Sequence, residues 1–381
     1  MNPFEQIESW SRRVFVYPLL RGFFRNKPLE HPIDLSRVHR ILIFRFDRIG
    51  DMLVTLPVLK ALKQCAPHVI VSVLGSRANA DLARACPAVD EVYVLEESWL
   101  RILGQVRMFR RQEPDVVLNF VFNKTTTPAI LSNLISPNGL KVGQGPDKYG
   151  FYFNRLVKVP RFERHMTEQL AMFVEQSFGV QIAATALETE LEIPVEQRRE
   201  VGEWLQQSGL KRRSESDTMG TPYLVFNISA FESNRTLSQE QASRIAFTLS
   251  RNPSIHTVIV FDPSDKALAQ LVETRQEFRS CSVFRTFGKR PLIQLASLIA
   301  GAMVVITPDT SIIHFASAMK TPTFGIYGEA YKTVEWAPYR VQHRIMKTEG
   351  DLPASSLSAE DIENQIALFL KTVLSGERDT A

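Results

Sequence analysis

Two aspartates stand where an apolar strand passes into a helix, and a carboxylate in such a turn can act as a base or bind a ligand. The first is Asp51, which follows the apolar run Ile41–Phe46 and precedes leucines at helical spacing. The second is Asp309, in the turn Pro308–Ser311 before a helix that contains His314. In an open α/β sheet, ligands bind beyond the carboxyl ends of strands, where backbone N–H groups converge. Both turns are therefore candidate ligand sites.

Each turn also has a purely structural interpretation. Asp51 has the right chemistry for a helix N-cap, and the local pattern favours neither interpretation over the other. Downstream, Thr310 and Ser311 can add hydroxyl donors at a helix N-terminus, which is a favourable place for phosphate. The structural alternative is a helix capped by Asp309 or Thr310, with His314 packed on its apolar side. At this point both alternatives stay open.

The residues around these turns alternate between strand and helix patterns in two series. The first series has strands at 41–46, 69–74, 92–95 and 116–120, with helices at 79–85 and 99–111. The second has strands at 223–228, 257–261, 282–284 and 303–307, with helices at 238–250, 265–275 and 292–300. This rhythm predicts two mostly parallel sheets covered by helices. We expect surface loops at 136–160, a helix within 161–179 and the domain boundary in the polar stretch 206–222.

Composition narrows the class of protein. A chain of 381 residues suggests about two domains, and 44% hydrophobic with 23% charged residues is typical of a soluble globular protein. The net charge of +4 is slight and no basic stripe is present, so we expect no nucleic-acid partner. Cys65, Cys86 and Cys281 form no CxxC pair, which indicates thiols in a reducing compartment and no zinc site.

The first 37 residues differ from the rest. The segment Trp10–Phe24 interleaves aromatic residues with arginines, a pattern typical of helices that lie in a membrane interface. It has no uninterrupted apolar core, so it is neither a signal peptide nor a membrane span. A helix packed on its own domain fits the same pattern equally well. Contact with a membrane surface and packing on the domain are the two alternatives.

Two sequence blocks, ILIFRFDRIGDMLVTLPVLKALK from Ile41 and PDTSIIHFASAMKTPTFGIYG from Pro308, resemble the ADP-heptose:lipopolysaccharide heptosyltransferases, glycosyltransferase family 9. The resemblance runs with gaps from about Ile41 to Gly328 and includes CPAVDEVYVL. It implies an α/β fold of GT-B type, two Rossmann-like domains facing a central cleft. We expect an amphipathic extension at 1–37, an acceptor-binding domain at 38–205, a nucleotide-sugar-binding domain at 222–350 and a C-terminal helix at 351–381.

The resemblance assigns roles to the two turns. It implies that Asp51 is the general base, and that Asp309, Thr310 and Ser311 hold the diphosphate region of the donor. Many relatives have glycine where this chain has Ser311, so a side chain stands here where backbone comes closest to the donor. A carboxylate can take the proton of an acceptor hydroxyl as the new bond forms.

Three further residues complete the expected donor site. Arg235, in SAFESNRTLSQE, is the basic residue expected to contact the diphosphate, although the more usual lysine followed by an aromatic residue is absent. Asp265 follows the next strand and is the candidate for the donor ribose. His314 either donates to a phosphate or packs, and its apolar neighbours Ile313 and Phe315 favour packing.

The resemblance implies an inverting glycosyltransferase that needs no metal and no cofactor. Its partners would be a nucleotide-sugar donor and a lipid-linked oligosaccharide acceptor of lipopolysaccharide core assembly, reached at the inner face of the cytoplasmic membrane. Two other functions fit the same architecture. A sugar-nucleotide epimerase would need a carboxylate and histidine set in the cleft, and a non-catalytic relative would bind a sugar nucleotide without turnover. The intact Asp51 favours an enzyme.

Overall fold

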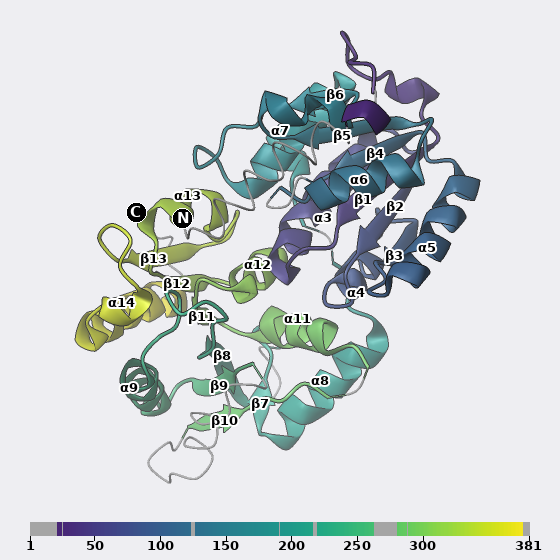
Figure 1. The fold of residues 1–381 in the computed structure, drawn as a ribbon. Coiled ribbons are helices and arrows are strands. Elements are labelled where there is room, and N and C mark those ends of the chain that lie inside the picture. The colour runs from purple at the N-terminus through teal and green to yellow at the C-terminus, as the bar shows by residue number, and fades with distance from the viewer. Residues whose placement is uncertain are drawn as a thin grey trace.

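The chain forms two α/β halves in a computed structural model (Figure 1). The structure describes residues 21–24, 26–122, 126–189, 191–215, 219–262, 280–287 and 289–375. Asp265 and most of the segment Trp10–Phe24 lie outside these residues, as does the helix expected at 265–275.

The first half is built on a six-stranded parallel sheet in the order β3-β2-β1-β4-β5-β6. The strands are β1 (Arg40–Arg45), β2 (Ile70–Gly75), β3 (Glu91–Val94), β4 (Val116–Asn119), β5 (Leu140–Gln144) and β6 (Arg155–Val157). Its helices are α3 (Ile49–Cys65), α4 (Ala80–Arg84), α5 (Trp99–Gln112), α6 (Thr126–Ile135) and α7 (Met166–Phe178). This strand order is that of a dinucleotide-binding Rossmann sheet, and the order reverses between β1 and β4.

The second half repeats the plan with a seven-stranded sheet. Its main path is β10-β9-β8-β11-β12-β13, and β7 pairs with β8 beside it. The strands are β7 (Leu210–Lys211), β8 (Thr221–Asn227), β9 (His256–Val260), β10 (Cys281–Val283), β11 (Val305–Pro308), β12 (Thr323–Tyr327) and β13 (His343–Lys347). The helices are α8 (Val195–Gln207), α9 (Gln239–Ser250), α11 (Pro291–Gly301), α12 (Ser311–Ala318), α13 (Thr333–Trp336) and α14 (Ala359–Leu374). The expectation of two parallel, helix-covered sheets is confirmed.

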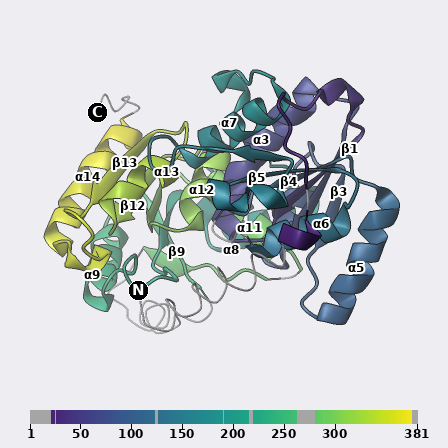
Figure 2. The same ribbon diagram turned by 45° about the horizontal axis from the view of Figure 1, so that its top comes forward.

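The two halves meet through helices rather than through sheet edges. In both views α3, α11 and α12 lie between the sheets, whereas α5 and α14 lie at opposite outer edges (Figures 1 and 2). Buried residues of both halves, among them Leu53 and Phe315, belong to one apolar cluster. Helix α8 precedes the expected boundary at 206–222 yet packs on α11 of the second half. Helix contacts of this kind do not define where one domain ends, so the expected domain limits stay a prediction.

The region 136–160 is not a set of surface loops, as the sequence suggested. It contributes strands β5 and β6 to the first sheet, and Tyr152 and Phe153 are buried. The side chain of Phe153 lies against Gly143, where any Cβ atom would overlap its ring. Glycine and aromatic residues are frequent in surface loops, which is why this sequence resembles one. Here they pack on each other, and β5 lies inside the sheet between β4 and β6.

None of the helices among the described residues combines the length and apolar character that crossing a bilayer requires. Within the same ranges, no three or more His, Cys, Asp or Glu side chains are grouped so that they could hold a metal ion. All three cysteines are free thiols.

Candidate functional site

Asp51 lies in the first turn of α3, just beyond the carboxyl end of β1. The helix begins at Ile49 with Arg48 in the N-cap position, so Asp51 is not the cap residue. The Asp51 residue is only 6% exposed, and its Oδ1 accepts a hydrogen bond from Arg45 Nη2 at 3.2 Å. A buried carboxylate needs such a partner, because an unpaired charge in the interior is costly. The cap interpretation of Asp51 is therefore wrong for this structure.

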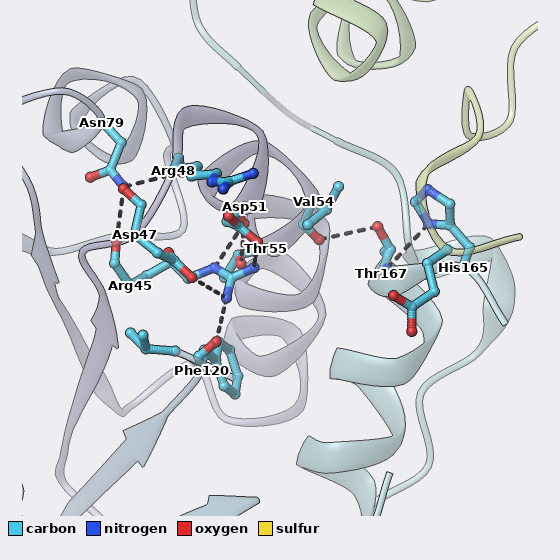
Figure 3. Close-up of polar contacts among 12 residues, drawn as sticks. Arg45, Asp47, Arg48, Asp51, Val54, Thr55, Asn79, Phe120, His165 and Thr167 are labelled. Carbon is cyan, nitrogen blue, oxygen red and sulfur yellow. Dashed lines mark hydrogen bonds and ion pairs between the residues drawn. The ribbon is translucent and has the colours of Figure 1, made fainter. Parts of the chain in front are cut away.

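Arg45, the last residue of β1, organises this turn and was not identified from the sequence. Its guanidinium is 1% exposed and donates from Nε to the Asp51 carbonyl at 2.8 Å and from Nη1 to Asp47 Oδ2 at 3.2 Å. Nη1 also donates to the carbonyl of Phe120, which follows β4. Figure 3 shows this side chain between Asp47, Asp51 and Phe120. Arg45 thus links the ends of β1 and β4, where the strand order reverses and ligands bind in open α/β sheets.

Asp47 is the second carboxylate on Arg45. Burial raises its pKa to about 7, the guanidinium of Arg45 opposes that rise, and the nearby charge of Asp51 adds to it. One of its oxygens, Oδ1, is buried without a hydrogen-bond partner among the described residues. The turn therefore holds two carboxylates on one arginine, with Asp47 poised to change its charge near neutral pH.

The matching turn of the second half holds Asp309, and the loop between β8 and α9 places Arg235, the other residue expected to bind the donor, beside it. Arg235 Nε lies 3.3 Å from Asp309 Oδ2, and its Nη1 donates to the Asp309 carbonyl at 3.4 Å. The same Nε lies 3.0 Å from Oε2 of Glu232. Burial raises the pKa of the Asp309 carboxyl, while the charges of Arg235 and Lys332 oppose that rise. The structure thus brings Arg235 and Asp309 together, and their expected contact with the donor stays a prediction.

Thr310 and Ser311 begin α12. Thr310 is the N-cap, and its Oγ1 accepts from the backbone N–H of Ile312 at 3.3 Å. The same oxygen accepts from Asn227 Nδ2 at 3.1 Å, and that amide also donates to Thr307 Oγ1 at 3.0 Å. Asn227 ends β8 and Thr307 lies in β11, so this network marks the point where the second sheet reverses its order. Sequence reasoning missed Asn227, because only the paired strands bring it to Thr310.

The two turns face each other where the N-terminus of α3 meets that of α12. A Cβ atom placed on Gly50 would lie 2.9 Å from Cδ2 of His314 and 3.7 Å from the Cα atom of Ser311. His314 is 6% exposed, and its ring lies 5.6 Å from that of Trp336 and 6.5 Å from that of His165. Burial, together with the charges of His165 and Arg235, lowers the pKa of His314 to about 3. His314 is thus packed as a neutral ring in the junction between the halves.

One ion pair bridges the halves beside these turns. Arg48 Nη1, from the start of α3, lies 2.6 Å from Oε1 of Glu232 in the second half. Because Glu232 also reaches Arg235 with its other oxygen, one carboxylate joins two guanidinium groups from opposite halves. Neither Arg48 nor Glu232 was identified from the sequence, since their pairing depends on how the halves dock. Asp265 lies outside the described residues, so its expected contact with a ribose stays a prediction.

Taken together, the site offers two complementary functions. The first half presents a carboxylate that can accept a proton, held by a buried arginine. The second half presents an arginine and the N-terminus of α12, which favour an anion without needing a metal. Such an arrangement suits the transfer of a group from a donor to a hydroxyl, with a phosphate-bearing part of the donor as the leaving group.

Comparisons with known proteins identify the family of this chain. The family model for glycosyltransferase family 9 (heptosyltransferase) matches residues 109–366, a range that includes Arg235 and Asp309 but not Asp51. The chain is 22% identical over 302 residues to lipopolysaccharide heptosyltransferase 3 of Escherichia coli, covering 76% of this chain and 82% of that protein.

Two solved structures share the fold. The family 9 glycosyl transferase of Veillonella parvula superposes with a TM-score of 0.73 at 19% identity, covering 89% of this chain and 99% of that chain. The ADP-heptose lipopolysaccharide heptosyltransferase II of Escherichia coli gives 0.68 at 17% identity, covering 87% and 99%. The expected GT-B architecture of two Rossmann-like halves is thereby confirmed. With its family model matched over most of its length, the chain belongs to glycosyltransferase family 9, the heptosyltransferases.

Proposed function

We propose that this enzyme transfers a heptose from ADP-heptose to a lipopolysaccharide core acceptor, inverting the anomeric centre without a metal ion. The observation that carries the proposal is the contact of the two turns. Gly50 brings the turn that holds Asp51 against the start of α12, where Asp309, Thr310 and Ser311 gather. A base and an anion site on facing elements are what a single displacement at an anomeric carbon requires.

The chemistry follows from the residues present. The acceptor hydroxyl oxygen attacks the anomeric carbon as the bond from that carbon to the donor diphosphate breaks. Asp51 takes the hydroxyl proton, and Arg45 keeps its carboxylate oriented. The departing diphosphate gains negative charge, which Arg235 and the free N–H groups of α12 stabilise. We propose that Asp265 contacts the donor ribose.

The choice of donor and acceptor rests on the relatives. The E. coli proteins that match this chain act, by name, on lipopolysaccharide, and one of them uses ADP-heptose. A lipid-linked acceptor lies in a membrane surface, so we propose that the enzyme works on the cytoplasmic side of that membrane. We further propose that the segment Trp10–Phe24 contacts the surface, because its arginines and aromatic residues fit an anionic interface.

The test is transfer itself. Purified enzyme is incubated with ADP-heptose and a core acceptor that lacks its terminal heptose, in buffer with and without a chelator. The expected result is ADP release with addition of one heptose to the acceptor, inverted at the anomeric carbon and unaffected by chelation. Donor loss without transfer would indicate epimerase-type chemistry, and donor binding without turnover would indicate a non-catalytic protein. Either result would overturn the proposal.

A further inference from the structure

Glu232 occupies the position in which an anion would meet both halves of the enzyme. Its Oε1 lies 2.6 Å from Arg48 Nη1, and its Oε2 lies 3.0 Å from Arg235 Nε. Arginine forks bind the paired oxygens of a carboxylate and those of a phosphate in similar ways. One carboxylate held by two arginines from opposite halves therefore has the geometry of a bound phosphate group.

The three side chains differ in how much room surrounds them. The Arg48 side chain is 61% exposed, that of Glu232 27%, and that of Arg235 18%. Arg235 is also held by Asp309, whose carboxyl side chain is 7% exposed. Arg48 and Glu232 therefore have more room to change conformation than Arg235, which a second carboxylate also holds.

The charges of this cluster balance, because Arg48 and Arg235 are paired with Glu232 and Asp309. Two carboxylates, Glu232 and Asp309, face Arg235, and a diphosphate arriving there would meet their repulsion. When Glu232 moves away, one of the two repelling carboxylates is gone. The guanidinium groups of Arg48 and Arg235 are then both available to the diphosphate.

We propose that Arg48 is a catalytic residue that binds the donor diphosphate from the acceptor side, and that Glu232 is its placeholder until the donor enters. This inference rests on the proposed function, because it needs a diphosphate donor. Donor binding then exchanges one anion for another on two arginines and keeps the halves bridged. Since negative charge on the leaving group grows during the reaction, Arg48 contributes to turnover as well as to affinity.

A structural ion pair would behave differently. An ion pair with one partner mostly exposed contributes little to stability, and removing either member would have the same small effect. The placeholder model predicts opposite effects. Arg48→Gln removes a cation from the donor, whereas Glu232→Gln removes a competitor of the donor.

The experiment measures the dissociation constant of ADP by calorimetry, and kcat with ADP-heptose, for wild type, Arg48→Gln, Glu232→Gln and the double variant. We expect Arg48→Gln to weaken ADP binding about tenfold or more and to lower kcat. We expect Glu232→Gln to tighten ADP binding several-fold, and the double variant to bind more tightly than Arg48→Gln but more weakly than Glu232→Gln, because Glu232 also competes for Arg235. Effects of the same sign in both single variants, or no effect in either, would overturn the proposal.

Controls separate this inference from the function on which it rests. The exposed pair Lys320–Glu188, 3.9 Å apart, gives the matched variants Lys320→Gln and Glu188→Gln, which should leave ADP affinity unchanged. Failure of the wild type to bind ADP or transfer heptose would overturn the proposed function, and this inference with it. A wild type that transfers heptose while Arg48→Gln and Glu232→Gln act alike would overturn only the role of Arg48.

Discussion

Asparagine at position 51 keeps an oxygen for Arg45 Nη2 but cannot accept the acceptor proton. We therefore expect Asp51→Asn to keep the fold and the affinity for ADP while lowering kcat by about 10² or more. Steady-state transfer kinetics and calorimetry with ADP measure the two effects. If ADP affinity falls and kcat does not, Asp51 is a binding residue and another base must be sought.

Asp47 should make stability depend on pH in a direction unusual for a carboxylate. Its pKa is raised to about 7, chiefly by burial, above an ordinary value of 3.8. Between these values the unfolded chain releases a proton that the folded chain retains, so this residue's contribution to stability declines as pH rises from about 4 to 7 and then levels off. Asp47→Asn resembles the protonated acid. It should gain stability relative to wild type over that window.

Chemical denaturation of both proteins at pH 4.5 and pH 8 measures this difference. Asp51→Asn should narrow the pH window in which stability declines, because the charge of Asp51 adds to the rise of the Asp47 pKa. A stability difference between Asp47→Asn and wild type that is equal at the two pH values would show that Asp47 does not titrate in this range.

How far the sequence reveals single residues depends on whether their role is local. Asp51 and Asp309 were identified because a strand, a turn and a helix follow one another in the chain around each. Arg45 was not, because inside the apolar run Ile41–Phe46 it looks like an exposed strand residue, whereas the fold buries it against β4. The pairing of Arg48 with Glu232 joins positions far apart in sequence.

At the scale of elements, the contact of α3 with α12 depends on a missing side chain. Gly50→Ala would place a Cβ atom 2.9 Å from Cδ2 of His314, which is buried and has little room to move. Overpacking typically costs about 1 to 3 kcal/mol. The helix itself would gain at most about 1 kcal/mol from alanine. We expect a net loss of stability, together with lower kcat, because the turn that holds Asp51 shifts away from α12.

Gly104→Ala in α5 is the control for this substitution. No atom lies within 4 Å of its Cβ position, so only the gain in helix propensity remains. Thermal unfolding should therefore show lower stability for Gly50→Ala and slightly higher stability for Gly104→Ala. Transfer kinetics should show a lower kcat for Gly50→Ala alone. A Gly50→Ala enzyme as stable and active as wild type would show that the approach of α12 does not need glycine.

Elements with regular periodicity were predicted well, and those with mixed composition were not. The strand expected at 41–46 is β1 at Arg40–Arg45, and the helix expected at 99–111 is α5 at Trp99–Gln112. Strands β5 and β6 were missed because Gly143, Asn154 and the aromatic residues nearby resemble turn chemistry. Their strand character comes from pairing with β4 and from the packing of Phe153 on Gly143.

At the scale of the whole molecule, neutral histidines hold the halves together. His165 Nδ1 accepts from the backbone N–H of Thr167 at 3.2 Å, which leaves the proton on Nε2 to donate to the carbonyl of Ala337 at 3.2 Å. The ring also stacks on Tyr339 with centroids 4.3 Å apart. Burial lowers the pKa of His165 to about 4, although Ala337 and the charge of Glu335 oppose that fall. A second proton would break the bond to Thr167.

Acid should therefore weaken the association of the halves. Below pH 6.5 His165 is protonated in the unfolded chain, whereas in the folded chain it stays neutral until the pH falls to about 4. Stability is lost as pH falls through this window, by about 2 to 3 kcal/mol at pH 4.5. His165→Gln should lose less stability than wild type between pH 7 and pH 4.5, as measured by denaturation. Equal losses in both proteins would contradict this role.

The N-terminal segment can be tested without disturbing the first half. Asn26 Nδ2 donates to Asn133 Oδ1 at 2.8 Å and to the carbonyl of Tyr152 at 2.9 Å, and Arg21 lies over the ring of Phe151 at 5.4 Å. A truncation that removes residues 1–20 keeps all these contacts. It still removes Trp10 and two of the arginines of the proposed membrane segment.

If that segment binds a membrane, each arginine removed costs about 1 kcal/mol near an anionic surface, and the lost aromatic area adds to this. Removal of residues 1–20 should then weaken sedimentation with anionic vesicles at least tenfold and slow transfer to a lipid-borne acceptor, because the enzyme no longer concentrates where that acceptor lies. Transfer to a short soluble acceptor and thermal stability should stay unchanged. Packing on the first half predicts instead that stability and both activities fall together. Vesicle binding that resists both truncation and added salt would remove the basis for the membrane proposal.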